Sequence, residues 1–362
     1  MTKLTQEGFD MLEALVRIPS ISEAEGAAVE YLVSWMQQHG FDATCDEAGN
    51  AVGIMEPAEG GPAQSDIREL VLLGHIDTVA GHPPVERRDG RLFGRGAVDA
   101  KGPLAAFATA ATMVGPRPGW RIVVAGAVEE EAATSKGARH IARTRKPELA
   151  IIGEPTGWQK VALGYKGRLL ADLTVERRLS HRAGPQASAP DMAIAYWNSV
   201  AGWLAEHNGT RGRIWDQVQG SVRGFLSADD GLDESAKLQM GFRLPLDMSP
   251  GRLEEHLLGL ANGHELRFYA GETAYRAEKN TPLVRSLLSA VRAHGGEPGF
   301  SVKTGTSDMN VVGPAWGCPI VAYGPGDSAL DHTPQEHVDL EEWRLGTQVL
   351  ADAIIRVTSV VQ

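Results

Sequence analysis

With 362 residues, the chain is longer than a usual single domain, and its 43% hydrophobic and 22% charged residues are typical of a globular protein. Its net charge of −11 argues against nucleic-acid binding, because phosphate contacts need basic patches. No apolar run reaches the roughly 18 residues of a membrane span, and the N-terminal sequence lacks the apolar stretch of a secretory signal. We therefore expect a cytoplasmic protein of two domains that contacts neither nucleic acid nor membrane. Cys45 and Cys318 lie far apart outside any CxxC pattern, which argues against a disulfide framework or a thiolate zinc site.

The first half of the chain alternates between helical and strand patterns. Residues 5–39 carry two apolar stripes at helical spacing, interrupted near Pro19, and a strand pattern follows at 51–55. Further along, apolar runs predict buried strands at 70–75, 121–128 and 149–153, and helical patterns separate them at 103–114 and 136–145. This alternation predicts an α/β domain.

The pattern changes near Lys166 and returns after Glu278. Between these points the sequence predicts a strand, a helix, a strand and a helix, at 168–178, 191–207, 237–248 and 249–261. Such a segment suggests a small α+β sandwich inserted into the first domain. The α/β pattern then resumes with a helix at 282–294, a strand at 318–324 and a last helix at 340–357.

Polar side chains follow the predicted buried strands at the edge where open α/β sheets bind ligands. His75 and Asp77 end the first strand, and their spacing of two directs both side chains to one side. Histidine can ligate a metal, and a neighbouring carboxylate can orient its ring, which is the role expected for Asp77. Glu154 follows another apolar strand, which Pro155 ends.

Two further acidic segments have both a functional and a structural interpretation. Asp99 lies in a glycine-rich turn ahead of a helix, where it could bridge two cations or cap the helix. Glu129, Glu130 and Glu131 repel one another and therefore need either open solvent or cations.

The last segment, GDSALDHTPQEHVDL, offers His332 and His337 near a turn. One or two histidines together with carboxylates at successive strand ends form a mixed nitrogen and oxygen set that suits a pair of zinc ions. The chain has no GxSxG motif, which argues against a serine-nucleophile hydrolase.

These five segments, taken in chain order from His75 to His332, resemble the M20 metallopeptidase family over nearly the whole chain. The resemblance implies a zinc-peptidase-like catalytic domain, a mixed sheet flanked by helices, at 1–166 and 279–362. It also implies an inserted lid and dimerisation domain at 167–278, and hence a homodimer or a higher homo-oligomer. The implied cofactor is a pair of Zn²⁺ ions, for which Co²⁺ could substitute.

The resemblance assigns metal-ligand roles to His75, Asp99, Glu130, Glu154 and His332, with Asp99 bridging the two ions. In the family, an acidic pair supplies the general base and then a ligand. The triple glutamate allows two frames, Glu129/Glu130 and Glu130/Glu131. Aligning AGAVEE with the family's usual ending favours Glu129 as base and Glu130 as ligand, although it puts Val128 where an aspartate is common.

The inserted segment and a later loop carry the implied substrate contacts. His181, in LSHRAGP, resembles a histidine that reaches the scissile carbonyl, although Arg182 replaces the usual serine after it. Arg243 lies where the family often has an arginine for a substrate carboxylate, although a surface salt bridge is an alternative role. The segment KTGTSDMN resembles the family's substrate-contacting loop and adds Gly305, Thr306 and Ser307.

Within the family, VDAKGP, EEEAATSKGAR, GEPTGW and GYKGR look most like hydrolases that release lysine or ornithine from an amino-group carrier protein. The scissile amide in that case joins the amino acid to a C-terminal glutamate of the carrier, in lysine or arginine biosynthesis. Acetylornithine deacetylase and succinyl-diaminopimelate desuccinylase are the alternatives. A non-catalytic homologue that binds a carrier or peptide is a more remote one.

Overall fold

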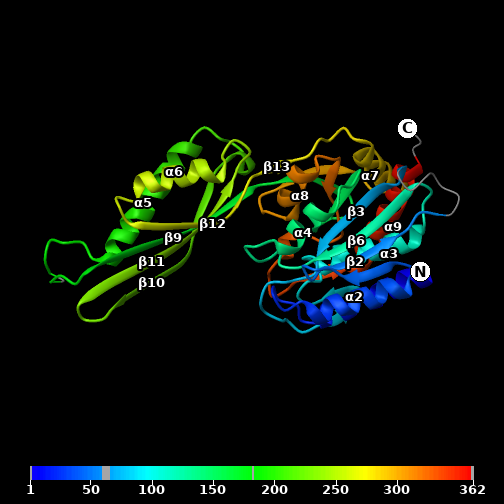
Figure 1. Cartoon of the computed structure of the whole chain (residues 1–362), viewed down its shortest axis with the longest axis horizontal. Helices are drawn as coiled ribbons and strands as arrows, with labels where there is room; N and C mark the ends of the chain where they lie inside the picture. The colour runs from blue at the N-terminus through cyan, green and yellow to red at the C-terminus, as the bar shows by residue number, and fades with distance from the viewer. Residues whose placement is uncertain (1, 59–65, 182, 360–362) are drawn as a thin grey trace. The chain divides into compact units, whose positions relative to one another are not determined.

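The computed structural model describes residues 2–58, 66–181 and 183–359, which form two compact units (Figure 1). The larger unit comprises Met1–Gly164, Ala277–Val302 and Val311–Gln362, and the smaller comprises Tyr165–Arg276 and Lys303–Asn310. The predicted domain boundaries at 166 and 278 compare with 164 and 276 in the structure.

The segment Lys303–Asn310 was expected in the catalytic domain, but it lies in the smaller unit. Side-chain hydrogen bonds that no sequence pattern reveals hold it there. Asn310 Nδ2 donates to the carbonyl of Thr273 at 2.7 Å, and the Thr306 hydroxyl donates to the carbonyl of Lys166 at 2.9 Å.

The sheet of the larger unit runs in the order β1-β2-β6-β3-β7-β15-β8, and β14 also pairs with β8. Strands β6, β3, β7 and β15 are mutually parallel, whereas β2 is antiparallel to β6. The sheet is therefore mixed, as predicted. Its strands are β1 (Asp42–Cys45), β2 (Ala51–Met55), β3 (Arg68–His75), β6 (Trp120–Ala127), β7 (Leu149–Gly153), β8 (Lys160–Tyr165), β14 (Gly299–Lys303) and β15 (Ile320–Ala322).

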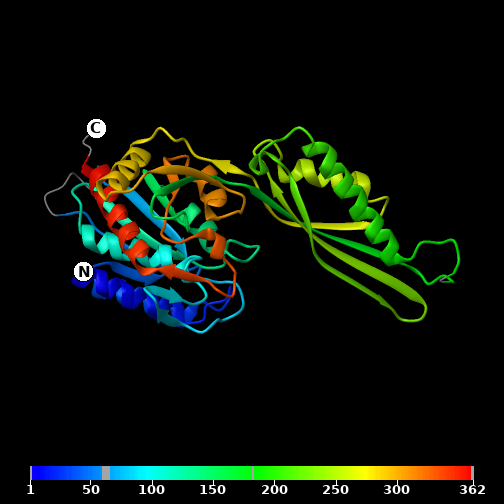
Figure 2. The ribbon, with the colours of Figure 1, turned by 180° about the vertical axis from the view of Figure 1, so that it is seen from behind.

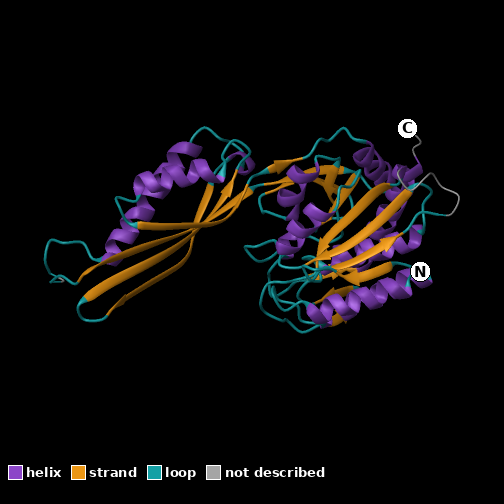
Figure 3. Ribbon diagram, in the orientation of Figure 1, coloured by secondary structure: helices purple, strands orange, loops and turns teal. Residues whose placement is uncertain are grey.

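The central strands are continuous apolar runs because helices bury them, and Leu72 and Val124 are fully buried. Figure 3 shows the helices that cover the strands of this unit. Helix α3 packs against α1 and α9, and α9 packs against α7; α3 and α9 are cyan and red in Figure 2. The helices are α1 (Lys3–Arg17), α2 (Gly26–Gln38), α3 (Lys101–Val114), α4 (Lys136–Thr144), α7 (Pro282–Ala293), α8 (Asp308–Trp316) and α9 (Leu340–Ser359).

A small antiparallel sheet of short strands accompanies the larger one, in the order β16-β5-β4. These strands are β4 (Glu86–Arg88), β5 (Arg91–Phe93) and β16 (His337–Asp339). These strands have no recognisable period-two signal because each has only three residues. The pairing of β5 with β16 nevertheless brings together two segments that are far apart along the chain.

The smaller unit is an antiparallel sheet in the order β10-β11-β9-β12, covered by helices α5 and α6. The predicted α+β sandwich is confirmed in kind, but the sequence predicted two strands where the structure has four. Strand β10 alternates poorly because most of its residues are exposed. The elements are β9 (Gly167–Arg178), α5 (Ala189–Asn208), β10 (Gln219–Asp229), β11 (Asp233–Leu244), α6 (Pro250–Leu260), β12 (Glu265–Glu272) and β13 (Tyr275–Arg276).

Each unit has its own apolar core. Trp343 and Phe107 are fully buried in the larger unit, and Phe242 is 1% exposed in the smaller. No helix in the described ranges combines the length and the apolar character that crossing a bilayer requires.

Candidate metal centre

Parallel strands bring the predicted acidic segments to one edge of the larger sheet. His75 ends β3, the three glutamates follow β6, and Glu154 follows β7. Because β3 is parallel to both β6 and β7, these strand ends lie side by side. The strand-end placement read from the sequence is therefore present in the fold.

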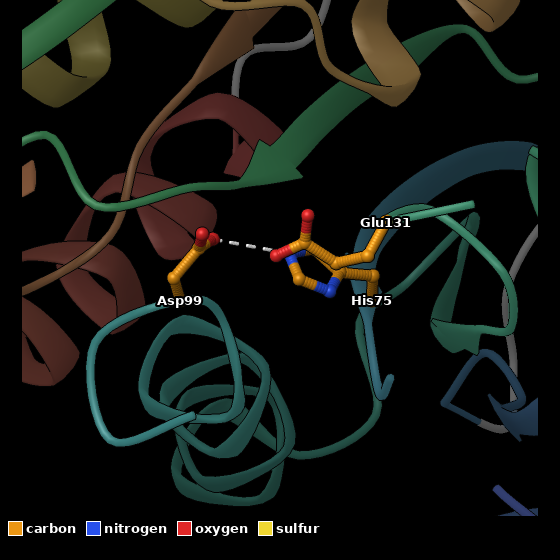
Figure 4. A group of neighbouring side chains, drawn as sticks. All are labelled: His75, Asp99 and Glu131. Carbon is orange, nitrogen blue, oxygen red and sulfur yellow. Dashed lines mark hydrogen bonds and ion pairs between the residues drawn. The ribbon is translucent and has the colours of Figure 1, made fainter. Parts of the chain in front are cut away.

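The His75 imidazole is 2% exposed and has a defined direction. Its Nδ1 lies 3.0 Å from the carbonyl oxygen of Asp77, to which it can donate, and its Nε2 lies 3.2 Å from Oδ1 of Asp99. A donor contact at Nδ1 leaves Nε2 as the ligand atom, which is the usual arrangement of a metal-binding histidine. Figure 4 shows this ring beside Asp99 and Glu131.

Asp99 presents its two oxygens to two different histidines. Oδ1 faces His75, and Oδ2 lies 2.9 Å from Nε2 of His332. A carboxylate that bridges two cations needs this arrangement, because each oxygen then serves one cation and its histidine.

Glu131 completes the cluster. Its Oε1 lies 2.7 Å from Nε2 of His332, and ligand atoms of His75, Asp99 and Glu131 all lie within 4.8 Å of one another. Nε2 of His332 thus faces the carboxylates of both Asp99 and Glu131, but it carries at most one proton to donate. These convergent nitrogen and oxygen atoms fit a divalent cation.

The charges at this edge are strongly coupled. Burial by itself would lower the pKa of His75, but hydrogen bonds with Asp77 and Asp99 raise it well above its usual value. Hydrogen bonds with Asp99 and Glu131 raise the pKa of His332 to about 10. Burial favours the neutral form of Asp99, yet the two histidines hold its pKa below the usual range. Histidine protons therefore offset the carboxylate charge, and metal binding would release them.

Asp77 is fully buried and holds neighbouring groups of the site in place through hydrogen bonds. Its Oδ1 accepts the backbone N–H of Glu130 at 3.1 Å, and its Oδ2 accepts that of Glu131 at 3.0 Å. The Ser22 hydroxyl also donates to Oδ2 at 2.7 Å. Oδ1 also lies 3.5 Å from Nδ1 of His75, so one carboxylate contacts both the His75 ring and the glutamate turn.

The three consecutive glutamates have different surroundings. Glu129 has a φ of 60°, and its carboxylate accepts a 2.6 Å hydrogen bond from Thr134 and lies 3.3 Å from Nζ of Lys136. The charge of Glu130 is one of the influences that raise the pKa of His75. Glu131 belongs to the cluster described above. Glu154 is 8% exposed at the end of β7.

The smaller unit holds the other predicted residues. Arg243 Nη1 donates to the Thr306 hydroxyl at 2.7 Å, in the loop that also contains Gly305 and the buried Ser307. Arg243 and the GTSD segment are therefore neighbours, although 63 residues separate Arg243 from Thr306. His181 lies on an exposed loop of the same unit.

Lys166 is a fully buried lysine beside this loop. Its ammonium group donates to the carbonyl of Ile214 at 2.9 Å, to that of Gln217, and to Oε1 of Gln219 at 3.0 Å. Burial, followed by the charge of Arg243, lowers the pKa of Lys166 to about 8.

Three residues at the site went unassigned by sequence reasoning: Ser22, Glu25 and Glu336. The sequence left Glu131 open as a ligand in the second glutamate frame. Glu25 Oε1 accepts the N–H of Glu129 at 3.1 Å. Only the triple glutamate gave a local signal, because Ser22 and Glu25 lie more than 50 residues from their partners. His337, which the sequence offered beside His332, instead packs on Phe93 with ring centres 4.7 Å apart.

Comparison with known proteins decides the family. The model of peptidase family M20/M25/M40 matches residues 71–356. The chain belongs to this peptidase family. The resemblance predicted from the five sequence segments is therefore confirmed, and so is a metallohydrolase that acts on amide bonds.

Several relatives of this M20 chain align with it from end to end. A LysW-lysine hydrolase of Deinococcus radiodurans is 44% identical over an alignment of 361 residues, which covers 97% of each chain. A protein of Thermococcus kodakarensis named a putative LysW-lysine/LysW-ornithine hydrolase is 36% identical over 350 residues, covering 97% of this chain and 92% of its own.

Solved structures share the M20 fold at low identity. The metallo-carboxypeptidase Sso-CP2 from Sulfolobus solfataricus has a TM-score of 0.77 and 18% identity, with 99% of this chain and 100% of the other covered. A Bacillus subtilis protein described as a dinuclear metal binding peptidase of family M20 has a TM-score of 0.70 and 12% identity, with 98% and 99% covered. These likenesses confirm the fold class.

Proposed function

We propose that this M20 hydrolase releases lysine or ornithine from LysW, which we equate with the amino-group carrier protein expected from the sequence. The observation that carries this proposal is the 44% identity, over 97% of both chains, to a LysW-lysine hydrolase. The scissile bond would be the amide to the carrier's C-terminal glutamate. The reaction would serve lysine biosynthesis, and arginine biosynthesis where the amino acid is ornithine, in the cytoplasm.

We further propose that the metal ligands are His75, Asp99, Glu131, Glu154 and His332. The 2.7 Å contact between Glu131 and His332 supports Glu131 in place of Glu130. This choice corresponds to the second frame that the triple glutamate left open.

In this frame Glu130 is the general base. The backbone N–H of Glu130 donates to Asp77, and the charge of the Glu130 carboxylate helps to raise the pKa of His75. Both observations support placing Glu130 beside the reacting atoms. Glu129 is a poorer candidate because Thr134 and Lys136 engage both of its oxygens. Glu129 would then occupy the position where the family commonly has an aspartate, which also accounts for Val128 before it.

Two divalent cations held by these residues would polarise the amide carbonyl and acidify water. The protein's own contribution is to hold and move the proton. Glu130 would accept it from the attacking water and return it to the leaving amine, so no covalent acyl-enzyme is required. His181 would stabilise the oxyanion, and Arg243 with the loop of Gly305, Thr306 and Ser307 would orient the substrate.

An amine-release assay tests the substrate. We expect hydrolysis of carrier-linked lysine or ornithine by protein loaded with Zn²⁺ or Co²⁺, and little hydrolysis of N-acetylornithine or N-succinyl-diaminopimelate. Turnover of only the two small substrates would overturn the proposal. Binding of the carrier without hydrolysis at any metal loading would favour the non-catalytic alternative.

Three matched substitutions test the glutamate frame. We expect Glu130→Gln to lower kcat by about 10²–10⁴-fold with both metals retained, because only proton transfer is lost. Glu131→Gln should lose metal, as measured by elemental analysis. Glu129→Gln is the control, with a smaller effect on kcat. Loss of turnover in Glu129→Gln with Glu130→Gln active would restore the first frame.

Zinc is the proposed native metal, because two histidines with carboxylates suit Zn²⁺ better than Mg²⁺, which prefers oxygen ligands. Elemental analysis of protein purified without added metal tests this choice. Two equivalents of zinc per chain are expected, and a predominance of another metal would contradict it.

We also propose a homodimer formed through the edge strand β10. This strand exposes Val222, Phe225 and Leu226 at 43%, 40% and 68%, and its outer edge has no partner strand within the described sheet. Leu226→Lys should shift the sedimentation of the protein from dimer to monomer. Leu258→Lys, at a position 53% exposed on α6, is the control that should leave it unchanged.

A further inference from the structure

Glu336 is a buried carboxylate with an unusually complete set of donors. Its side chain is fully buried, and Oε1 accepts the backbone N–H groups of Gly96, Val98 and Asp99 at 2.9, 3.1 and 3.2 Å. Oε2 accepts from the Arg95 guanidinium, whose Nε also donates to the carbonyl of Gly81. Three of these four donors belong to the turn that ends in Asp99.

The backbone around Glu336 connects two segments of the metal centre. Strand β16 begins at the next residue and pairs with β5, and the N–H of Gly94 extends this ladder to the carbonyl of Glu336 at 3.1 Å. Asp99 follows β5 on one side, and His332 precedes Glu336 by four residues on the other. The two segments end in the 2.9 Å contact between His332 and Asp99.

Strand pairing alone does not account for the Glu336 side chain. A buried carboxylate is costly unless it is paired and hydrogen-bonded, and a buried turn likewise needs acceptors for its N–H groups. Here the Glu336 carboxylate accepts from the N–H groups of the buried turn, so each group satisfies the other. The turn ends in Asp99, which presents one oxygen to His75 and the other to His332. Replacement of the charge would therefore loosen the Asp99 turn rather than the sheet.

We infer that Glu336 is a positioning residue of the metal centre, which fixes the backbone of Asp99 and its spacing from His332. Glu336 acts through these ligands and does not touch the substrate. The inference rests on the proposed metal site and adds a residue outside it, on which metal affinity depends.

Glu336→Gln tests this inference because the amide can accept from the turn or face Arg95, but cannot satisfy both. Metal dissociation constants are measured by chelator competition, together with the visible spectrum of the Co²⁺-loaded protein and the melting temperature of the metal-free protein. We expect affinity for at least one metal ion to fall by about 10–100-fold, with a changed Co²⁺ spectrum.

Glu69→Gln is the matched control. Glu69 pairs with Arg145 at 2.9 Å at the opposite end of β3, so its replacement removes a partly buried ion pair away from the site. It should lower the melting temperature without changing metal affinity or the spectrum. Glu336→Asp keeps the charge but is one methylene shorter, and we expect it to have an intermediate metal affinity. This variant also tests the inference if Glu336→Gln fails to fold.

The outcomes separate the two claims. Wild-type affinity and spectrum in folded Glu336→Gln or Glu336→Asp would overturn the positioning role alone. The positioning role would also be overturned if Glu69→Gln weakened metal binding equally, because the loss of metal affinity would then follow the loss of stability. A wild-type protein that binds no divalent cation would overturn the proposed function and the role of Glu336 with it.

Discussion

At the scale of single residues, Asp77 shows how one buried side chain can serve several parts of the site. It contacts the His75 ring, two backbone N–H groups of the glutamate turn and the Ser22 hydroxyl. Its pKa lies below the usual value because these contacts, led by that with His75, outweigh the burial that would raise it. Residues behind the ligands thus decide where the ligands point.

Ser22→Ala should weaken this arrangement without abolishing it. The 2.7 Å hydrogen bond to Asp77 is lost, and a bond to a charged group contributes roughly 1.5–3 kcal/mol. We expect a lower melting temperature and a kcat reduced by roughly tenfold if part of that energy positions Asp77. Ser199→Ala, on an exposed face of α5, is the control. Equal kcat in both variants would contradict the role given to Ser22.

Cys318 provides a test of pH dependence. Burial raises the pKa of its thiol to about 11. The thiolate is the reactive form, so the alkylation rate should rise about tenfold per pH unit without a plateau below pH 10. Iodoacetamide labelling of the Cys45→Ser variant, which leaves Cys318 as the single thiol, measures this rate. A plateau near pH 8.5, as for unfolded protein, would contradict the raised pKa.

At the scale of elements, the site depends on close packing behind the strand ends. Helix α4 approaches the end of β6 at Gly137, where an added Cβ would lie 2.3 Å from Oδ1 of Asn50 and 2.5 Å from the nitrogen of Val128. Asn50 connects the same two elements, since it accepts from Val128 and donates to the carbonyl of Gly137. The glutamate turn begins directly after Val128.

Gly137→Ala should therefore affect both stability and activity. Overpacking of this kind costs about 1–3 kcal/mol, and the shift would reach the glutamate turn. Thermal melting and kcat measure the two effects. The control is Gly26→Ala in the first turn of α2, where an added Cβ meets nothing within 4 Å. A Gly137→Ala protein as stable as the control would show that α4 can move freely.

At the scale of the whole molecule, the chain builds two separate cores. The core of the larger unit and that of the smaller unit share no residue. Because each unit buries its own apolar side chains, local unfolding of one need not expose the core of the other.

Phe242→Ala tests this independence. Loss of a buried phenylalanine costs about 3–5 kcal/mol, and we expect reduced hydrogen-exchange protection within β9, β10, β11 and β12 only. Phe107→Ala in α3 is the reciprocal control, with the loss confined to the larger unit. A uniform loss of protection in either variant would indicate a single cooperative unit.

Much of this organisation was determined by the sequence itself. Apolar runs such as that ending at His75 specify buried parallel strands, and parallel strands align their carboxyl ends, so the edge that holds the site follows from local pattern. The insertion of a second domain follows from the change of pattern near Lys166. The family follows from five segments in order, which the match over residues 71–356 confirms.

Other features were decided only by tertiary structure, because they depend on contacts between distant segments. Glu129, Glu130 and Glu131 are chemically identical in sequence, and only their contacts in the fold distinguish them. Glu129 has a positive φ and contacts Thr134 and Lys136, whereas Glu131 contacts His332. Glu336 receives its donors from residues more than 230 positions away. The exposed strand β10 has no periodic signal in its sequence, and its strand conformation follows from its antiparallel pairing with β11. Periodicity records burial along one element, whereas these choices depend on which elements meet.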